Sequence, residues 1–555
     1  MTLNNEVDTQ VLIVGAGPCG LMLALELGRR GVPCILLDKK FSTSFNPQAN
    51  ATQARTMEHF RRHGFANEIR SQGLPGDHPS DIAYFTRFLE HELARLSLPT
   101  ANQALDSVKS LTGSWSAAEL PHRISQKYVE ATLLSYVKRC LSVDLRFGWV
   151  LNHFEQDESG VFAEVSQVDS IEYLKVRAKF LIGVDGARSM VRQQLGILWQ
   201  GDTGYKREFM GGKMLAVYLR APDFYKQMSR GLAWMYVSVN SQRRALLATV
   251  DGQGEFAFHA AVHEGEDVDD WGEHEAKRIF FQALGAEIPV EILSVATWTA
   301  GHALVAEKFQ DRRIFLGGDA AHLFTPTGGL GYNTAIEDAV NLGWKLSCVL
   351  KEGAPVSLLN SYEAERKPLA IRNTDYAKQF ADSVGLIRVT PTLEENSVAG
   401  EQERKVAAEK LNAHVRLEFN IPGVTFGGRY DNSSIIVSDG FLSPTDEPNV
   451  YHPTAIPGGR APHVWLDGHH SLFDSFNFEW TLLKLGNRPP DSTGFTLAAE
   501  KLGMDLKEIS FDSDQLVALY EQPLILIRPD QVVAWRGSDS SSALAVLNQV
   551  TGRSS

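Results

Sequence analysis

Three glycines near the N-terminus have the spacing that serves the phosphates of a dinucleotide. They are Gly15, Gly17 and Gly20, which form the pattern G-x-G-x-x-G after an apolar run. In such a turn the first glycine allows a tight bend, the second lets the backbone approach a pyrophosphate, and the third lets helix and strand pack closely. Unpaired N–H groups at the start of the following helix attract phosphates. We interpret this stretch as a dinucleotide-binding turn.

The neighbouring residues predict the strand and the helix that such a turn requires. Residues 11–14 are β-branched or aliphatic throughout, which is typical of a strand buried on both faces. Pro18 suits the first turn of a helix, the apolar positions continue to Leu27, and Gly31 is placed to end the helix. This context favours a dinucleotide site over a bare glycine-rich turn.

A second predicted strand, residues 34–37, ends in an acid. Asp38 at this place would accept hydrogen bonds from a ribose 2′-OH and would repel a 2′-phosphate. Lys39 follows it, and Arg55 lies in a helix predicted from residue 52 onward. Such arginines usually form a solvated face. Because a pyrophosphate would be near, we predict that Arg55 contacts phosphate or ribose.

A second stretch has a similar organisation. The predicted buried strand 313–316 ends in glycines and Asp319, and a Pro/Gly-rich turn then leads into a long helix. Backbone N–H groups at such a turn suit a second anionic or polarised group, and Asp319 suits a ribityl or ribose hydroxyl. A nicotinamide enzyme has no need of this second site, whereas a larger cofactor lying across the sheet does. The residues predicted to serve it are Gly318, Asp319, Pro326, Gly329, Leu330, Gly331, Tyr332 and Asn333.

Length and composition limit the classes of protein that need to be considered. At 555 residues the chain is too long for one core, so we expect two or three domains. A net charge of −13 argues against nucleic acid or an anionic membrane as a partner. The first ten residues lack the basic region of a signal peptide, and we predict no membrane-spanning segment.

The cysteines and histidines predict neither disulfides nor a metal site. Four cysteines occur without a C-x-x-C pair, which fits a reducing cytosol and a cytoplasmic protein. Two H-x-x-x-H pairs, His59 with His63 and His259 with His263, lack the H-E-x-x-H form. We interpret them as chance pairs of packed or surface side chains.

Alternating apolar residues predict two further groups of strands. Segments 144–150, 161–165 and 173–184 form a predicted β-meander. Segment 234–239 and the hairpin 246–258 predict a second antiparallel sheet, inserted into the nucleotide-binding domain.

Three motifs together resemble those of the single-component FAD-dependent aromatic hydroxylases, the class A flavoprotein monooxygenases of the p-hydroxybenzoate and phenol hydroxylase kind. The resemblance covers residues 8 to 370, approximately. The motifs are the first glycine turn, Gly183-x-Asp185-Gly186 with Ser189 and Arg192, and Gly318-Asp319-Ala320-Ala321-His322 with Pro326 and Gly331.

The resemblance implies bound FAD and a transient NADPH or NADH. It sets the ADP half of FAD on the first motif, with Asp38 on the adenosine ribose, and the 326–331 loop against the isoalloxazine. It assigns Gln126 to the flavin side, Asp185 and Gly186 to both cofactors, and Asp319 to the ribityl chain. The sequence has no second G-x-G-x-x-G unit for the nicotinamide cofactor.

The resemblance also implies an α/β fold with three parts. A Rossmann-like FAD-binding domain with a helical tail would comprise residues 1–80, 107–200 and 301–425. An inserted antiparallel-sheet substrate domain would comprise 81–106 and 201–300, and residues 426–555 resemble the thioredoxin-like domain of the phenol-hydroxylase subgroup. No cysteine follows Cys348, so this last domain cannot do dithiol chemistry. We expect a packing or dimer-supporting role for it, and a homodimer is the family expectation.

The chemistry that the family implies is hydroxylation of a small aromatic substrate. NAD(P)H reduces FAD, O2 adds to give a C4a-hydroperoxide, and its distal oxygen attacks an electron-rich ring. A phenol reacts more readily as the phenolate, so members usually supply a base. In phenol-hydroxylase-like members an aspartate stands where this chain has Asn50, whose amide cannot accept a proton near pH 7.

Two interpretations of this departure stay open. The substrate is already ionised, as a nitrophenol, nitrocatechol or polyhalogenated phenol would be, or another residue such as Tyr236 or His302 is the base. Asn50, Tyr236, His302 and Pro326 are therefore the predicted catalytic residues.

Two other functions fit the same motifs. One is hydroxylation of a polycyclic polyketide or antibiotic in a wider pocket. The other is a flavin reductase that does not activate O2, which NADPH oxidation without a hydroxylated product would indicate.

Overall fold

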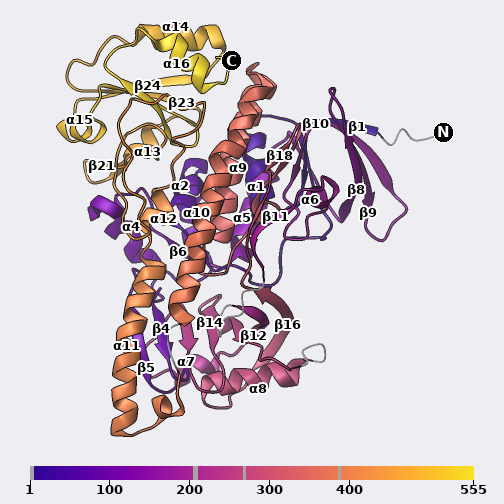
Figure 1. The fold of residues 1–555 in the computed structure, drawn as a ribbon, viewed down its shortest axis with the longest axis vertical. Helices are drawn as coiled ribbons and strands as arrows, with labels where there is room; N and C mark the ends of the chain where they lie inside the picture. The colour runs from indigo at the N-terminus through magenta and orange to yellow at the C-terminus, as the bar shows by residue number, and fades with distance from the viewer. Residues whose placement is uncertain (1–5, 204–210, 267–270, 386–388, 555) are drawn as a thin grey trace.

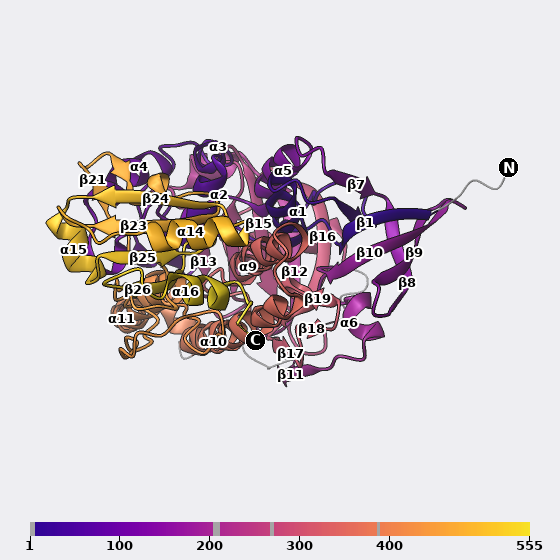
Figure 2. The same cartoon turned by 90° about the horizontal axis from the view of Figure 1, so that it is seen from above.

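The computed structural model describes residues 6–203, 211–266, 271–385 and 389–554. Figure 1 shows three sheet-containing parts: a nucleotide-binding sheet at the upper right, a C-terminal sheet at the upper left, and a second sheet below them. Viewed from above, the C-terminal elements lie to the left and strands β1 and β10 to the right (Figure 2).

The nucleotide-binding sheet has the strand order β18-β19-β10-β1-β2-β7. From β19 to β7 the neighbours are parallel, and β1 lies between β10 and β2. This central position explains why residues 11–13 are fully buried. Helices α1, α5 and α9 pack in the same core. The bounds are β1 (Glu6–Val14), α1 (Pro18–Arg29), β2 (Cys34–Asp38), α5 (Gln126–Val137), β7 (Val143–Phe147), β10 (Tyr173–Gly183), β18 (Gln310–Asp311), β19 (Ile314–Leu316) and α9 (Gly331–Lys351).

The predicted meander is correct for its last two strands and wrong for its first. Strands β8 (Trp149–Gln156) and β9 (Val161–Gln167) pair antiparallel with each other, and β9 pairs with β10. Residues 143–147, however, form β7 and join the main sheet in parallel with β2. Gly148, with φ of +75°, makes the break between β7 and β8 that the alternation did not show.

The second sheet has seven strands in the order β16-β12-β15-β14-β13-β4-β5. The predicted hairpin is confirmed as β14 and β15, whereas β4 and β13 pair in parallel. Side chains alternate between two faces: one packs against α8, the other against α11. The bounds are β4 (Ile82–Phe85), β5 (Glu92–Leu96), β12 (Gly212–Arg220), β13 (Met235–Ser238), β14 (Ala245–Thr249), β15 (Glu255–Ala261), α8 (Glu273–Leu284), β16 (Glu291–Ala300) and α11 (Val398–Phe419).

The C-terminal sheet has the order β24-β23-β25-β26, with β23 and β24 parallel and the other pairs antiparallel. The succession β-α-β-α-β-β-α is a thioredoxin-like arrangement, so the predicted fold class is confirmed. Its elements are β23 (Trp480–Leu485), α14 (Thr493–Leu502), β24 (Leu506–Phe511), α15 (Asp514–Tyr520), β25 (Leu524–Ile527), β26 (Val533–Gly537) and α16 (Ala543–Val550).

Shorter elements and two tail helices connect these sheets. Among the described residues, no helix has both the length and the apolar composition needed to cross a bilayer. The remaining strands and α-helices are β3 (Ala51–Thr52), α2 (Ala54–His63), α3 (Ala66–Arg70), α4 (Ala101–Ser110), β6 (His122–Arg123), α6 (Met190–Gln194), β11 (Trp199–Asp202), α7 (Asp223–Gln227), β17 (Ala303–Ala306), β20 (His322–Leu323), α10 (Asn360–Gly385), α12 (Pro422–Phe426), β21 (Trp465–Leu466), β22 (His470–Ser471) and α13 (Leu472–Ser475).

Candidate functional site

The three glycines of the first turn have different environments. Gly15 has φ of +113°, and a Cβ there would collide with the carbonyl of Val184, while a Cβ at Gly20 would collide with the carbonyl of Gly15. A Cβ at Gly17 would meet no described heavy atom within 4 Å. The fold itself therefore requires Gly15 and Gly20, whereas Gly17 borders free space that a ligand can enter.

The start of α1 is suited to an anion. Pro18 opens the helix, and among the described residues no side chain caps it and no acid lies in its first turn. Its first N–H groups remain available, and the helix dipole favours negative charge there. The glycine turn and the start of α1 therefore both suit a dinucleotide.

Asp38 lies at the end of β2, as predicted. Its carboxylate accepts hydrogen bonds from the N–H groups of Ala16, at 2.7 Å, and Lys40, at 2.8 Å. These contacts fix the carboxylate beside the glycine turn and leave lone pairs for ribose hydroxyls. Lys39 is exposed at the same strand end.

Arg55 faces away from this site. Its Nη1 donates to Glu58, at 2.9 Å, and to Gln531, at 2.7 Å, and its Nη2 donates to the carbonyl oxygen of Asp530 at 2.5 Å. The guanidinium joins α2 to the C-terminal sheet. This geometry does not support the predicted phosphate contact, because long-range partners occupy the group.

The second predicted stretch has an open acid backed by a buried network. Asp319 is exposed and has no hydrogen-bond partner among the described residues, so its carboxylate is free for a hydroxyl. Behind it, Asp338 accepts from Gly318 N–H at 3.1 Å, from His322 Nε2 at 2.6 Å and from Arg366 Nε at 2.8 Å. Burial raises the pKa of Asp338, but His322 and Arg366 more than offset this and lower it. Sequence reasoning missed Asp338 and Arg366; charges inside apolar helices were the available signal.

The 326–331 loop is held rigidly by side chains from elsewhere in the chain. Gln53 Nε2 donates to the carbonyl of Gly328 at 2.7 Å, and Glu418 Oε1 accepts from the N–H of Gly328 at 3.0 Å. Gly328 and Gly329 both have φ of +63°, a left-handed conformation that glycine adopts readily. Pro326 is exposed at the start of this loop.

The two residues that follow the loop have structural partners. Asn333 Nδ2 donates to the carbonyls of Ala51, at 2.8 Å, and Gly329, at 2.6 Å, and its Oδ1 accepts from Gln53 N–H at 2.9 Å. The Tyr332 hydroxyl is hydrogen-bonded to Thr52. Asn333 therefore clamps the loop onto β3, and its amide is used in that clamp. Gly331 and Leu330 begin α9, where no described side chain provides a cap.

Gln126 and Asp185 lie at the starts of two other helices. Gln126 Nε2 donates to Glu130 at 2.7 Å and to Gln48 at 3.3 Å. Asp185 Oδ2 accepts from Met190 N–H at 2.7 Å, while its buried Oδ1 has no partner within the described ranges. Gly186, with φ of +86°, borders open space. Asp185 thus keeps one oxygen for a ligand.

The two predicted bases differ in placement. Tyr236 is fully buried on the α8 side of the second sheet, its oxygen accepts from Ala233 N–H at 2.8 Å, and burial raises its pKa. The register of β13 directs Tyr236 to the sheet face opposite Met235 and Val237, and this placement does not favour its predicted role as a base. His302 lies beside the loop: its carbonyl accepts from Thr325 Oγ1 at 3.3 Å, and its buried Nδ1 has no partner in the described chain.

The opposite face of the second sheet carries residues that sequence reasoning missed. His259 and Trp298 lie there half-buried, with Met235 and Leu246. Trp298 Nε1 donates to His259 Nδ1 at 3.3 Å, which places the ring proton on Nε2. Burial lowers the pKa of His259 to about 4, so the ring is neutral at physiological pH. The alternation of β15, which buries Phe256 and Phe258 on the α8 side, was the signal for this orientation.

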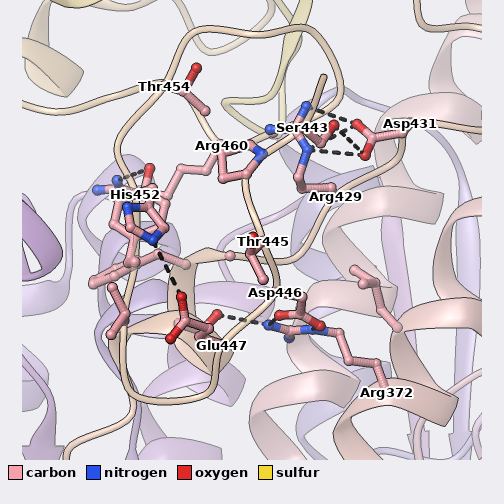
Figure 3. Close-up of a pocket in the computed structure, with 18 residues that line it drawn as sticks. Arg372, Arg429, Asp431, Ser443, Thr445, Asp446, Glu447, His452, Thr454 and Arg460 are labelled. Carbon is pink, nitrogen blue, oxygen red and sulfur yellow. Dashed lines mark hydrogen bonds and ion pairs between the residues drawn. The ribbon is translucent and has the colours of Figure 1, made fainter. Parts of the chain in front are cut away.

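A hollow of about 210 Å³ opens elsewhere, between the tail helices and the segment that leads to the C-terminal sheet (Figure 3). Its charges are paired with one another: Arg372 with Asp446 at 2.6 Å, Arg429 with Asp431 at 2.8 Å. No described residue predicted to bind a cofactor lines it. We do not assign the cofactor there. Nor do three His, Cys, Asp or Glu side chains gather in a metal-binding cluster anywhere in the described ranges.

Fold and site together define a class of protein: an α/β protein with a dinucleotide-binding type of glycine turn, a clamped loop before α9 and a separate second sheet. The FAD binding domain family matches residues 8–377, and the aromatic-ring hydroxylase C-terminal family matches residues 454–554. The chain belongs to the FAD-dependent aromatic-ring hydroxylases. It is an FAD-dependent aromatic monooxygenase.

Relatives support this assignment along the whole chain. The 2,4-dichlorophenol 6-monooxygenase of Delftia acidovorans is 29% identical, over 96% of this chain and 95% of its own length. Aklavinone 12-hydroxylase RdmE of Streptomyces purpurascens is 28% identical, over 98% and 97%. The rebeccamycin biosynthetic enzyme RebC with reduced flavin superposes with a TM-score of 0.87 at 32% identity, covering 99% of this chain and 100% of RebC.

Proposed function

We propose that this monooxygenase uses NADPH or NADH and O2 to hydroxylate a phenolic ring that is already ionised when it binds, such as a nitro- or halophenol or the corresponding catechol. Asn50 carries the proposal. It stands where phenol-hydroxylase-like members have an aspartate, and its buried Oδ1 has no partner among the described residues. The next residue, Ala51, accepts a hydrogen bond from Asn333, which clamps the 326–331 loop. An amide beside that loop can hydrogen-bond a ring substituent but cannot remove its proton.

The residues that would hold FAD are those with free space or free lone pairs. Gly17 and the start of α1 would take the pyrophosphate, Asp38 the adenosine ribose and Asp319 the ribityl chain. When bound, FAD supplies oxygen activation and transfer. The chain supplies the rest: the clamped loop fixes the position of the ring system, and the sheet face with α11 excludes water. His259 Nε2–H would donate a hydrogen bond to a substrate oxygen.

A second candidate is a polycyclic polyketide ring. Relatives such as aklavinone 12-hydroxylase share the full length of the chain, and the half-buried, largely apolar side chains Met235, Leu246 and Trp298 line a broad face. An assay that measures both NAD(P)H oxidation and the product separates both candidates from a flavin reductase, because a reductase would consume NAD(P)H without any hydroxylated product.

The first experiment is NAD(P)H oxidation by the FAD-loaded protein in air, with products identified by mass. The panel runs from phenol through nitrophenols and halophenols to nitrocatechols, with a polycyclic quinone added. We expect stimulation and a hydroxylated product with the acidic phenols. Turnover of plain phenols alone would contradict the ionised-substrate proposal, and turnover of the polycyclic ring alone would favour the second candidate.

Asn50→Asp sharpens this test. A carboxylate at residue 50 restores a base, so the variant should gain about tenfold or more on unsubstituted phenol, within the range that general bases provide, and little on nitrophenols. The gain should follow the ionisation of the new carboxyl in a pH–rate profile. Asn152→Asp, on the exposed face of β8, is the matched control. An unchanged pH profile and substrate preference in Asn50→Asp would contradict the proposal.

A further inference from the structure

Arg123 is a buried cation without a hydrogen-bonded anion. Its side chain is on β6, which pairs with β3 so that Arg123 lies opposite Ala51. The residue is 5% exposed, and its Nη1 has no hydrogen-bond partner in the described part of the chain. Its Cζ lies 4.5 Å from the ring centroid of Trp234 and 5.8 Å from that of Phe419. Aromatic rings stabilise the charge in part but leave its N–H donors unsatisfied.

The nearest acid does not provide the missing partner. Glu418 raises the pKa of Arg123 through space, although burial dominates and lowers it to about 10. Glu418 Oε1 already accepts from Gly328 N–H at 3.0 Å, and its Oε2 lies 3.0 Å from His414 Nε2. The described residues include no ion pair between Arg123 and Glu418. Arg123 remains charged near neutral pH, since its pKa is well above 7.

Three other buried arginines of this protein each lie beside a carboxylate. Arg366 lies 2.8 Å from Asp338, Arg460 2.5 Å from Glu58, and Arg528 2.7 Å from Glu365. Burying a charge is costly unless an opposite charge and hydrogen bonds compensate it. Arg123 lacks such a carboxylate, so we infer that its partner comes from outside the chain.

Arg123 lies between the 326–331 loop and the second sheet. Ala51, opposite Arg123, lies against Gly329, where an added Cβ would approach the Ala51 Cβ to 2.9 Å. Trp234 comes from the second sheet, and its Nε1 is also buried without a described partner. Two unsatisfied donors thus lie close to the 326–331 loop, where the proposed function has the substrate ring approach the flavin. Both groups donate only, so the group that satisfies them must be an acceptor.

We propose that Arg123 and Trp234 form a binding subsite for an anionic oxygen on the aromatic substrate, either a phenolate or a ring carboxylate. The guanidinium pairs with the oxygen, and the Trp234 and Phe419 rings contact the substrate ring. The inference rests on the proposed function for the identity of the substrate as an aromatic ring, and it names how that ring is held.

Direct binding to the FAD-loaded protein tests the subsite without requiring turnover. The probes are 2,4-dinitrophenolate, benzoate and neutral nitrobenzene, titrated by calorimetry and by the change in the flavin absorbance. Arg123→Met should weaken binding of an anionic probe by about ten- to a hundredfold, the value of a hydrogen bond to a charged group, and change nitrobenzene binding by less than about threefold. The probe whose binding Arg123→Met weakens more, dinitrophenolate or benzoate, shows whether the subsite holds a phenolate or a carboxylate oxygen.

Two further variants keep the test decisive. Arg123→Met replaces a buried charge by an apolar side chain of similar length, so FAD content and melting temperature should be retained. Trp234→Phe removes the indole N–H together with part of the ring system, and it should weaken binding of the anionic probes by a smaller factor, about three- to tenfold. Arg139→Met removes an exposed arginine whose Cζ lies 4.3 Å from the Tyr136 ring centroid and should change nothing.

The inference is overturned if Arg123→Met binds the anions as tightly as the native protein does, or if the substitution weakens the binding of nitrobenzene as much as the binding of the anions. Failure of the proposed function has a different signature. Anions that bind through Arg123 but yield no hydroxylated product in the oxidation assay would contradict the function and leave the subsite intact.

Discussion

Two regions of this protein bury polar and charged side chains. In one region these groups are paired with one another, and in the other they have no hydrogen-bond partner. At the junction with the C-terminal sheet, Glu365 lies 2.7 Å from both Arg528 and Lys345, and Glu58 lies 2.5 Å from Arg460 and 2.9 Å from Arg55. Between the 326–331 loop and the second sheet, buried polar atoms of Asn50, Trp234 and Arg123 have no hydrogen-bond partner in the described ranges.

The difference teaches how to separate structure from function among buried polar groups. Ion pairs at the junction are complete within the chain, so they need no ligand and hold two parts of the protein together. Unpaired groups near the loop carry a desolvation cost that the chain itself does not offset, and an acceptor on a ligand would offset it. If this comparison is right, substitutions at the junction affect stability, and those between the 326–331 loop and the second sheet affect binding.

The largest expected effect is on stability, from Glu58→Gln. This change leaves Arg460 and Arg55 buried without their carboxylate, and removing one partner of a buried pair costs about 3–5 kcal/mol. Urea denaturation of the native and variant proteins measures the loss. Glu401→Gln is the matched control, since Glu401 is 63% exposed and pairs with Lys405 at the helix surface; such pairs contribute about 0.5 kcal/mol or less. Equal losses in the two variants would remove the distinction between the regions.

Low pH should remove the stability that Glu58 contributes at the same junction. Burial raises the pKa of Glu58, but Arg460 and Arg55 lower it to about 2 from an ordinary value of 4.5. A lowered folded-state pKa contributes stability that is complete above about pH 4.5 and is lost as the pH falls toward 2. The urea midpoints of native protein and Glu58→Gln should therefore converge as the pH falls through this range. A constant difference between them would contradict the assignment.

A smaller effect, confined to the cofactor, is expected from Gly17→Ala. The new methyl group would enter the space beside α1 that we assign to the pyrophosphate, and Gly17 has φ of −74°, which alanine accepts. We expect FAD affinity to fall by about 1.5–3 kcal/mol, equivalent to one lost charge-assisted hydrogen bond, with the melting temperature of the FAD-free protein unchanged. Gly20→Ala should instead destabilise the fold. Unchanged FAD affinity in Gly17→Ala would place the cofactor elsewhere.

The smallest effect should follow Trp298→Phe. It removes the donor to His259 Nδ1, so the imidazole no longer favours one tautomer, and binding of an oxygen-bearing ring should weaken about two- to tenfold. Nitrogen NMR of the His259 ring would report the loss of the Nε2–H tautomer directly. Trp149→Phe, a half-buried tryptophan on β8, serves as the control. A fixed tautomer in Trp298→Phe would contradict the positioning role.

Sequence alone determined the parts of the protein that depend on neighbouring residues. The strand, glycine turn and helix of residues 11–29, the acid at the end of β2, and the second strand, turn and helix that end in α9 all follow from local backbone requirements. For the same reason the FAD family and the hairpin of β14 and β15 were predictable. Asn50 was recognisable as a departure because it lies within such a contiguous motif.

Only the tertiary structure decided which side chains meet. Arg55 is hydrogen-bonded to Asp530 and Gln531, which lie between β25 and β26, and no local pattern indicated these partners. Tyr236 packs on the α8 side of its sheet because a one-residue change of register turns a side chain to the opposite face. Asp338, Arg366, His259 and Arg123 were missed for the same reason. Their environments are made by contacts between segments far apart in the chain, and the local pattern that directs a strand or helix carries no information about those contacts.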